Sequence, residues 1–204
     1  MANQLSAGFG LRPIGKVGGN PSNMATTQYE IANDYTTAIY NGGIVVPDSS
    51  GTIVISDQAI APLGVLAGVE FVDSVTGKTT FKNYWPGSNA VSVDTNHPVK
   101  AFVHDDPMQL YVVVADGTNT DRATALADTF INCDMASVNN GSTATGRSSD
   151  MLDISTAATT NTLDVRIVGL YEDAANADYS AAGHQYIVRL NGHFNSGTTI
   201  AVGT

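Results

Sequence analysis

The sequence predicts a mainly β protein: an antiparallel β-sandwich or barrel-like domain with one short helix and an extended N-terminal arm. Short apolar runs rich in β-branched and aromatic residues recur along the chain and are separated by Gly, Asn and Asp. Only one stretch has helical spacing, and no repeat with a fixed period is visible. No apolar run approaches the ~18 residues that a membrane-spanning helix needs. We therefore expect an arm over residues 1–26, followed by a single β-rich domain over residues 27–204.

The strongest pattern covers Val99–Gly117. Two apolar runs, Val99–Val103 and Leu110–Ala115, flank the polar break His104–Pro107, which is a strand–turn–strand signature. Leu110–Ala115 is apolar at both odd and even positions, which indicates burial on both faces. We therefore expect this run to be the central strand of the fold and part of a central hairpin.

The first 26 residues are rich in Gly, Asn and Ser, and their hydrophobic residues follow neither the helix nor the strand period. Such a segment is either a floppy terminus or an arm that orders when it lies against this subunit or a neighbour. The spaced hydrophobic residues favour a docked arm. If the arm is separate from the domain, deleting Met1–Gly19 should leave a folded domain.

Alternation and turn residues predict short strands in the first half of the domain. They are Thr27–Ala32, Ile44–Val46, Thr52–Ser56, a bent or closely approached strand within Pro62–Val72, Thr79–Asn83 and Asn89–Asp94. Trp85 stands beside Pro86-Gly87, where a tryptophan can be a ligand platform or a large core side chain at a strand end. The core interpretation is favoured because large aromatic residues dominate protein cores.

The second half contains the helix candidate, Asp121–Ile131, with Asp121 or Thr120 as its cap. Its apolar face comprises Ala123, Leu126, Ala127 and Phe130. Residues 132–162 are expected to form a long Ser/Thr-rich loop with one weak strand at Met151–Ile154. Two clear strands follow, at Leu163–Tyr171 and at Gln185–Leu190.

The sequence nominates no catalytic residue, no metal ligand and no cofactor. It lacks a nucleophile elbow, a P-loop and a dinucleotide fingerprint, so we expect a protein that is not an enzyme. The densest ionisable cluster is His104-Asp105-Asp106, which could bind a divalent ion or hold a base, although a solvated turn is the favoured interpretation. Asp116–Asp121 has a superficial likeness to a calcium loop but lacks its ligand order, so a capped turn is favoured. Cys133 is expected to be a buried, inert thiol.

Charge narrows the choice of partners. The chain has 19 acidic and 9 basic residues, a formal net charge of −10, and charged residues make up 14 % of it. No basic cluster is visible, which disfavours binding to nucleic acid or to an anionic membrane. The first residues lack a signal-peptide pattern, and the single cysteine cannot form an internal disulfide, which fits a protein made in a reducing cytoplasm.

Five short motifs together resemble a group of small structural proteins of tailed phages, especially marine phages. The motifs are Gly10-Leu11-Arg12-Pro13-Ile14-Gly15, Tyr84-Trp85-Pro86-Gly87, Val103-His104-Asp105-Asp106-Pro107, Gly146-Arg147-Ser148-Ser149 leading to Leu152-Asp153, and Leu190-Asn191-Gly192-His193-Phe194. The resemblance covers most of the chain.

The resemblance implies a virion component of the capsid decoration (cement) type. Such a protein is made in the host cytoplasm and is located on the outer capsid surface. It would be a β-rich homotrimer that binds the major capsid protein, stabilises the head, and uses no cofactor, nucleic acid or membrane. Within the arm, the expected capsid- or subunit-binding residues are Phe9, Leu11, Arg12, Pro13 and Ile14. An arm of this kind can bind by strand addition, and trimeric binding multiplies weak contacts.

Two alternatives remain open. The first is another virion component, such as a carbohydrate-binding adhesin, tail or spike module, in which Trp85 and Tyr84 would stack on sugars. The second is a hydrolase on a β scaffold, for which the sequence nominates no convergent carboxylates. We rank the cement protein first and the enzyme last.

Overall fold

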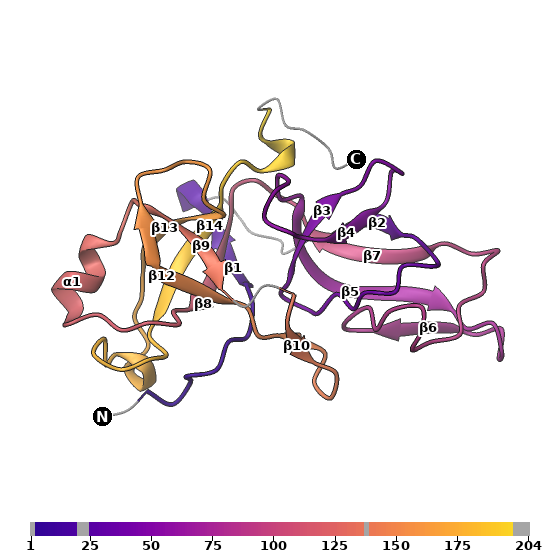
Figure 1. Cartoon of the computed structure of the whole chain (residues 1–204), viewed down its shortest axis with the longest axis horizontal. Helices are drawn as coiled ribbons and strands as arrows, with labels where there is room; N and C mark the ends of the chain where they lie inside the picture. The colour runs from indigo at the N-terminus through magenta and orange to yellow at the C-terminus, as the bar shows by residue number, and fades with distance from the viewer. Residues whose placement is uncertain (1–2, 20–24, 137–138, 198–204) are drawn as a thin grey trace.

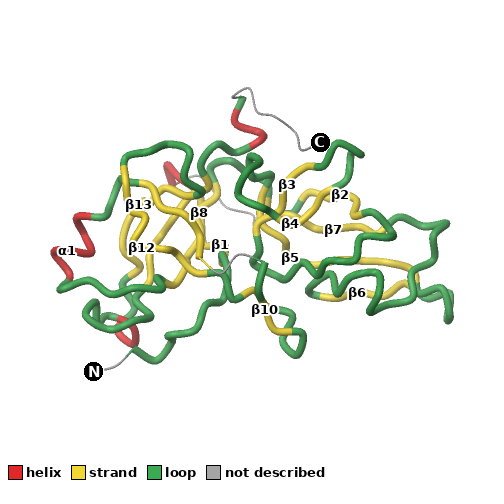
Figure 2. Tube along the Cα trace, viewed as in Figure 1, coloured by secondary structure: helices red, strands yellow, loops and turns green. Residues whose placement is uncertain are grey.

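The computed structural model describes residues 3–19, 25–136 and 139–197. The prediction of a mainly β protein with antiparallel sheets and one α-helix is confirmed. Figures 1 and 2 show an elongated molecule in which two lobes lie side by side along the long axis. We call them lobe 1, which carries the helix, and lobe 2. No helix in the described ranges is long and apolar enough to cross a membrane.

Lobe 1 is built on a six-stranded antiparallel sheet. The bridge between Ala115, which follows β8, and Leu152 of β12 brings two separated strands together, so the sheet curls into a barrel-like form. The helix α1 lies at the outer end of this lobe (Figure 1). The strand order is β1 (Arg12–Lys16), β8 (Gln109–Val114), β14 (Gln185–Leu190), β13 (Val165–Tyr171), β9 (Asn132–Ala136) and β12 (Met151–Ala158).

Lobe 2 is built on the second six-stranded sheet. The register of its longest strand shifts between Leu66 and Gly68, which confirms the expected bend. The strand order is β2 (Thr27–Ile31), β7 (Val99–His104), β5 (Gly64–Val72), β3 (Ile44–Pro47) and β4 (Ile53–Ile55), with β6 (Thr79–Lys82) also paired to β5.

Each lobe has its own hydrophobic core, and Ile44 and Val65 of lobe 2 join the core of lobe 1 across the seam. In lobe 2, Trp85 is 0 % exposed, meets Phe71 edge to face, and donates its indole N–H to the carbonyl oxygen of Tyr35 at 3.0 Å. The prediction that Trp85 is a core side chain is confirmed, and the alternative prediction of a ligand platform is wrong. In lobe 1, β8 is buried on both faces, with Val112 and Val113 both fully buried, as predicted. Burial of one such side chain contributes about 1.5–3 kcal/mol.

The expected central hairpin does not form. β7 pairs with β2 and β5 in lobe 2, whereas β8 pairs with β1 and β14 in lobe 1. The polar break His104–Pro107 therefore carries the chain from one lobe to the other. The physical reason lies in the burial patterns: β7 alternates between buried and half-buried residues, while β8 is buried almost throughout and needs neighbours on both sides.

The expected arm is docked on its own chain rather than free. β1 pairs with β8, and Leu11 is 1 % exposed in the core of lobe 1. Nearer the terminus, the Asn3 amide donates to the carbonyl oxygens of Asp178 and Ala182. The register of β1 shifts between Pro13 and Gly15, which explains why its sequence shows no clear alternation. Residues 1–2 and 20–24 of the expected arm lie outside the described residues.

The helix is shorter than predicted. α1 spans Arg122–Ala127, and Asp121 caps it by accepting a hydrogen bond from the N–H of Thr124 at 2.8 Å. The predicted apolar face is not a packing face, because Leu126 is 47 % and Phe130 is 79 % exposed. The chain leaves the helix to enter β9, and Phe130 adopts a left-handed backbone with φ 72°. The Phe130 N–H donates instead to Ile167 of β13.

Residues 132–162 are largely strand rather than loop. They contain β9, β12 and the small hairpin of β10 (Gly141–Ser142) and β11 (Arg147–Ser148). A side-chain hydroxyl group replaces one of the backbone hydrogen bonds between β9 and β12, because Thr156 Oγ1 accepts from the N–H of Asp134 at 2.9 Å. The predicted strand at 89–94 is reduced to a single bridge between Val93 and Asp73.

Candidate functional site

The β10–β11 hairpin comes from the lobe 1 segment between β9 and β12 but docks on lobe 2. Asn41 of lobe 2 donates its N–H to Gly146 and accepts from the N–H of Ser148, both at 2.9 Å. The side-chain amide of Asn83 donates to the carbonyl oxygen of Thr145 at 2.7 Å. The hairpin therefore joins the lobes and forms a wall where they meet.

The N-terminal segment forms the opposite wall. The N–H of Leu11 donates to the carbonyl oxygen of Gly42 at 2.8 Å, and that of Gly10 donates to Asp150 at 3.2 Å. Gly10 has φ +72°, and a Cβ atom there would lie 2.6 Å from the carbonyl oxygen of Gly42. Only glycine permits this close approach of two backbones.

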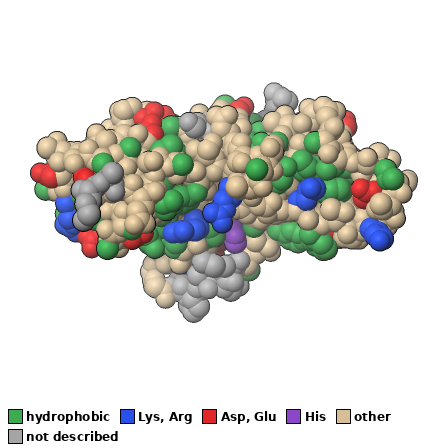
Figure 3. Space-filling model, turned by 90° about the horizontal axis from the view of Figure 1, so that it is seen from below, with side chains coloured by type: hydrophobic (Ala, Val, Ile, Leu, Met, Phe, Trp, Pro, Cys, Tyr) green, Lys and Arg blue, Asp and Glu red, His purple; other side chains and the backbone are tan. Residues whose placement is uncertain are grey.

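Between these walls lies a hollow of about 760 Å³, which we call the seam groove. In the view of Figure 3, Lys and Arg side chains and a His side chain gather near the middle of the molecule, where the lobes meet. The lining residues are Leu5, Ala7, Gly8, Phe9, Leu11, Arg12, Pro13, Asn41, Gly42, Val65, Leu66, Ala67, His104, Gly141, Ser142, Thr145, Arg147, Ser148 and Ser149.

The groove lining is basic. It contains Arg12 and Arg147, both exposed, and the half-buried His104, but no Asp or Glu. The Arg12 guanidinium lies 5.3 Å from the centre of the Phe9 ring, within range of a cation–π contact. Neither arginine is ion-paired to a carboxylate of the described residues. Burial lowers the pKa of His104, so its imidazole is neutral at pH 7 and the two arginines supply the charge.

Four of the five arm residues predicted to bind a partner line this groove: Phe9, Leu11, Arg12 and Pro13. Leu11 is buried beneath the surface, so its contacts are within the core of its own chain. Ile14 lies in β1 and is not among the lining residues. Phe9, Arg12 and Pro13 are therefore the members of this set that a partner could touch in the groove.

A buried carboxyl group lies next to the seam and was not anticipated from the sequence. Asp150 is 2 % exposed, and its Oδ1 atom has no hydrogen-bond partner among the described residues. Burial raises the pKa of Asp150 to about 7. The available signal was its position directly after Gly146-Arg147-Ser148-Ser149, a segment that packs against both lobes.

The carboxylates of the predicted His104-Asp105-Asp106 cluster have separate partners. Asp105 accepts from Thr27 Oγ1 at 2.8 Å and from the Tyr29 hydroxyl at 2.7 Å. Asp106 forms an ion pair with Lys16 at 2.5 Å. Within the described part of the chain, no group of three His, Cys, Asp or Glu side chains is arranged to hold a metal ion. These two carboxylates therefore connect the segment between the lobes, His104–Pro107, to β2 and to β1.

The Asp116–Asp121 segment also has structural partners. Asp121 caps α1, and Asp116 Oδ1 accepts from the N–H of Ile154 in β12 at 3.3 Å. The capped-turn interpretation is confirmed at Asp121, whereas Asp116 connects this segment to β12.

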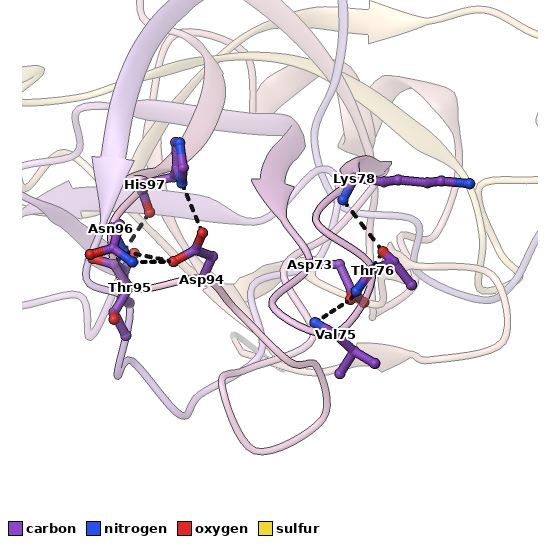
Figure 4. Close-up of polar contacts among 9 residues, drawn as sticks. Asp73, Val75, Thr76, Lys78, Asp94, Thr95, Asn96 and His97 are labelled. Atoms are coloured by element: carbon purple, nitrogen blue, oxygen red, sulfur yellow. Dashed lines mark hydrogen bonds and ion pairs between the residues drawn. The ribbon is translucent and has the colours of Figure 1, made fainter.

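Two further polar clusters occupy turns of lobe 2 (Figure 4). Asp73 accepts from the N–H groups of Val75 and Thr76, and Asp94 accepts from Asn96 and His97. Backbone N–H donation, from Thr76 and Asn96 respectively, is the main cause that lowers the pKa of each carboxyl group. These contacts stabilise turns and leave no carboxylate directed at a shared centre.

The remaining reactive groups are protected by burial. Cys133 is 0 % exposed, and burial raises its pKa to about 12, so the thiol stays protonated, as expected for an inert residue. His184 is also fully buried and packs against the rings of Tyr179 and Tyr186.

A second hollow, of about 1060 Å³, lies in lobe 1 beside the start of α1. Arg122, the cationic side chain of its lining, is already ion-paired with Glu172. The seam groove is therefore the stronger candidate site. Comparison of the chain with protein-family models, curated proteins and solved structures finds no match.

Proposed function

We propose that this chain is a phage capsid decoration (cement) protein that binds the outer surface of the major capsid protein shell and stabilises the head. The observation that carries the proposal is the convergence of three motifs of the phage-protein resemblance on one groove. Arg12 comes from the first motif, His104 from the third and Arg147 from the fourth. These residues are far apart in the sequence, and the fold brings them together in the lining of one groove.

The way in which the two lobes are joined supports a role in holding neighbouring capsid subunits together. Backbone contacts on both sides of the seam groove hold the lobes together without a disulfide bond. Large apolar side chains are also exposed outside the groove lining, including Val75 at 80 % and Phe81 at 67 %. A specific interface buries on the order of 1,200–2,000 Å². Trimeric attachment would multiply three modest contacts into strong binding by avidity.

The carbohydrate-binding alternative loses Trp85, the first of its two named residues. Trp85 is buried, and Tyr84 stacks on Tyr40 with ring centres 5.5 Å apart. No exposed tryptophan remains as a sugar platform, because the chain has only this one. The cement proposal is therefore the better supported of the two.

The proposal is tested by the oligomeric mass of the purified chain and by its co-sedimentation with expanded empty capsids of its own phage. We expect a trimer that sediments with the capsids, measured by light scattering and by gel analysis of the pellet. A monomer that stays in the supernatant would refute the cement function.

A further inference from the structure

The seam groove has the opposite charge character to the rest of the chain. The whole protein carries a formal charge of −10, yet the groove lining holds two arginines and a histidine and no acidic side chain. Of the seven Lys and Arg side chains outside the groove, three are ion-paired within the described residues: Lys16 with Asp106, Lys100 with Glu70 and Arg122 with Glu172. Two exposed guanidinium groups without carboxylate partners are suited to bind an anion, because arginine binds carboxylates through two parallel hydrogen bonds.

The same groove has a substantial apolar surface. Leu5, which is 44 % exposed, and the half-buried residues Phe9, Pro13 and Ala67 line it beside the arginines. A phosphate group or a nucleic-acid backbone would match the charge but would leave these side chains without a counterpart. A ligand that matches both must place apolar groups next to negative charge.

The groove is large enough for such a ligand. Its volume of about 760 Å³ falls in the range of roughly 300–1,000 Å³ that is typical of ligand sites. Its walls come from the N-terminal segment, from lobe 2 and from the β10–β11 hairpin. Hydroxyl groups of Ser142 and Thr145 on the hairpin add hydrogen-bonding capacity for a polypeptide backbone.

We propose that the seam groove binds a short acidic peptide segment of a partner protein, in which Asp or Glu stands next to an aliphatic or aromatic residue. Arg12 and Arg147 bind the carboxylates, and the apolar strip around Phe9 and Leu5 takes the hydrophobic side chain. The inference rests on the proposed function in one respect only: under that function, the protein that carries the acidic segment is the major capsid protein.

The test is a selection of peptides from a displayed library of random sequences on the immobilised full chain. We expect the selected peptides to combine Asp or Glu with an adjacent Leu, Ile or Phe. Affinities of the synthesised peptides are then measured by fluorescence anisotropy. The double variant Arg12→Glu/Arg147→Glu should weaken binding by about tenfold or more, and added salt should weaken binding to the natural chain.

The matched control is Lys78→Glu/Arg122→Glu, which makes the same change in net charge at two exposed side chains outside the groove lining and should leave the affinity within about twofold. The neutral pair Arg12→Gln/Arg147→Gln separates loss of the guanidinium groups from charge repulsion, and circular dichroism melting confirms that each variant is folded. Selection of no peptides, selection of basic or purely apolar peptides, or equal weakening by the control would overturn the inference. Displacement of the peptide by a single-stranded oligonucleotide of equal affinity would also overturn it, because the groove would then bind phosphate.

The two proposals fail separately. Acidic peptides that bind in the groove of a chain that ignores capsids would leave the inference standing and remove the cement function. If no peptide is selected and Arg12→Glu/Arg147→Glu still binds capsids, the cement function stands and the peptide inference is removed.

Discussion

Replacing Asp150 by Asn should change how the stability of the protein depends on pH. The Asp150 carboxyl is buried at the seam, and burial raises its pKa from 3.8 to about 7. The main opposing influences are hydrogen bonds involving Ser148 and Asn140, and no charged neighbour contributes. Since asparagine has nearly the same shape and does not titrate, the variant removes only the cost of a buried negative charge.

The sign and size follow from proton linkage. The folded state binds the Asp150 proton more tightly than the unfolded state, so the contribution of this group to stability is fully present below pH 3.8. It is lost progressively as the pH rises, and the loss is complete above the folded pKa of about 7. The pKa difference of about three units, at 1.36 kcal/mol per unit, corresponds to about 4 kcal/mol. Relative to Asp150→Asn, the natural protein should therefore lose about 1.4 kcal/mol of unfolding free energy for each pH unit in this window.

The assay is urea unfolding of both proteins at about pH 5, 6, 7 and 8, followed by circular dichroism and by Trp85 fluorescence. The decisive quantity is the slope of the difference in unfolding free energy against pH, because a constant offset from the new amide cancels in it. Asp73→Asn is a control without slope: the N–H of Thr76 lowers the pKa of Asp73 below 3.8, so the contribution of that carboxylate is constant between about pH 5 and 8 and is lost only at more acidic pH. A difference between the natural protein and Asp150→Asn that does not vary with pH would refute a buried, high-pKa carboxyl at the seam.

Three further changes test the fold. Val113→Asp places an unpaired charge in the core of lobe 1 and should cost several kcal/mol, enough to abolish the cooperative circular dichroism melt; a soluble variant with a near-native Tm would contradict the central position of β8. Phe130→Gly relieves a left-handed backbone at an exposed side chain and should stabilise the protein by about 1 kcal/mol, seen as a higher Tm; a lower Tm would show that the ring is packed. Deletion of residues 1–16 removes β1 and Leu11, whose side chain alone is worth about 2–5 kcal/mol, so the urea midpoint should fall sharply; an unchanged midpoint would restore the view of a separable arm.

Local patterns predicted the parts of the fold that local physics determines. The run Leu110–Ala115 is apolar at every position except for the polar hydroxyl of Tyr111, and the structure buries it on both sides. Trp85 beside Pro86-Gly87 is the largest side chain of its core, as expected. The bend of β5 follows from small residues such as Gly68, where the register shifts.

Pairing between distant segments was beyond such patterns. β7 and β8 are adjacent in sequence and look like a hairpin, and only the partners available in each lobe decide that they separate. β12 was predicted only as a weak strand over Met151–Ile154, because its Ser and Thr side chains join the hydrogen-bond network and its register shifts between Asp153 and Ala158. β1 escaped notice for a similar reason, since its shift at Pro13 hides the alternation.

The candidate site lies where sequence patterns are least informative. Phe9 and Arg12 were identified from the sequence, but the groove needs Arg147, which a small hairpin of lobe 1 brings against Asn41 of lobe 2. The contacts that build it are backbone hydrogen bonds between glycine-rich segments, and these have no periodic signature. Glycine is needed at Gly10 because the backbones approach so closely, so a site of this kind is built by residues that look like loop in the sequence. It follows that substitutions in the glycine-rich walls should alter the groove before they unfold either lobe, because the two hydrophobic cores lie largely within the separate sheets.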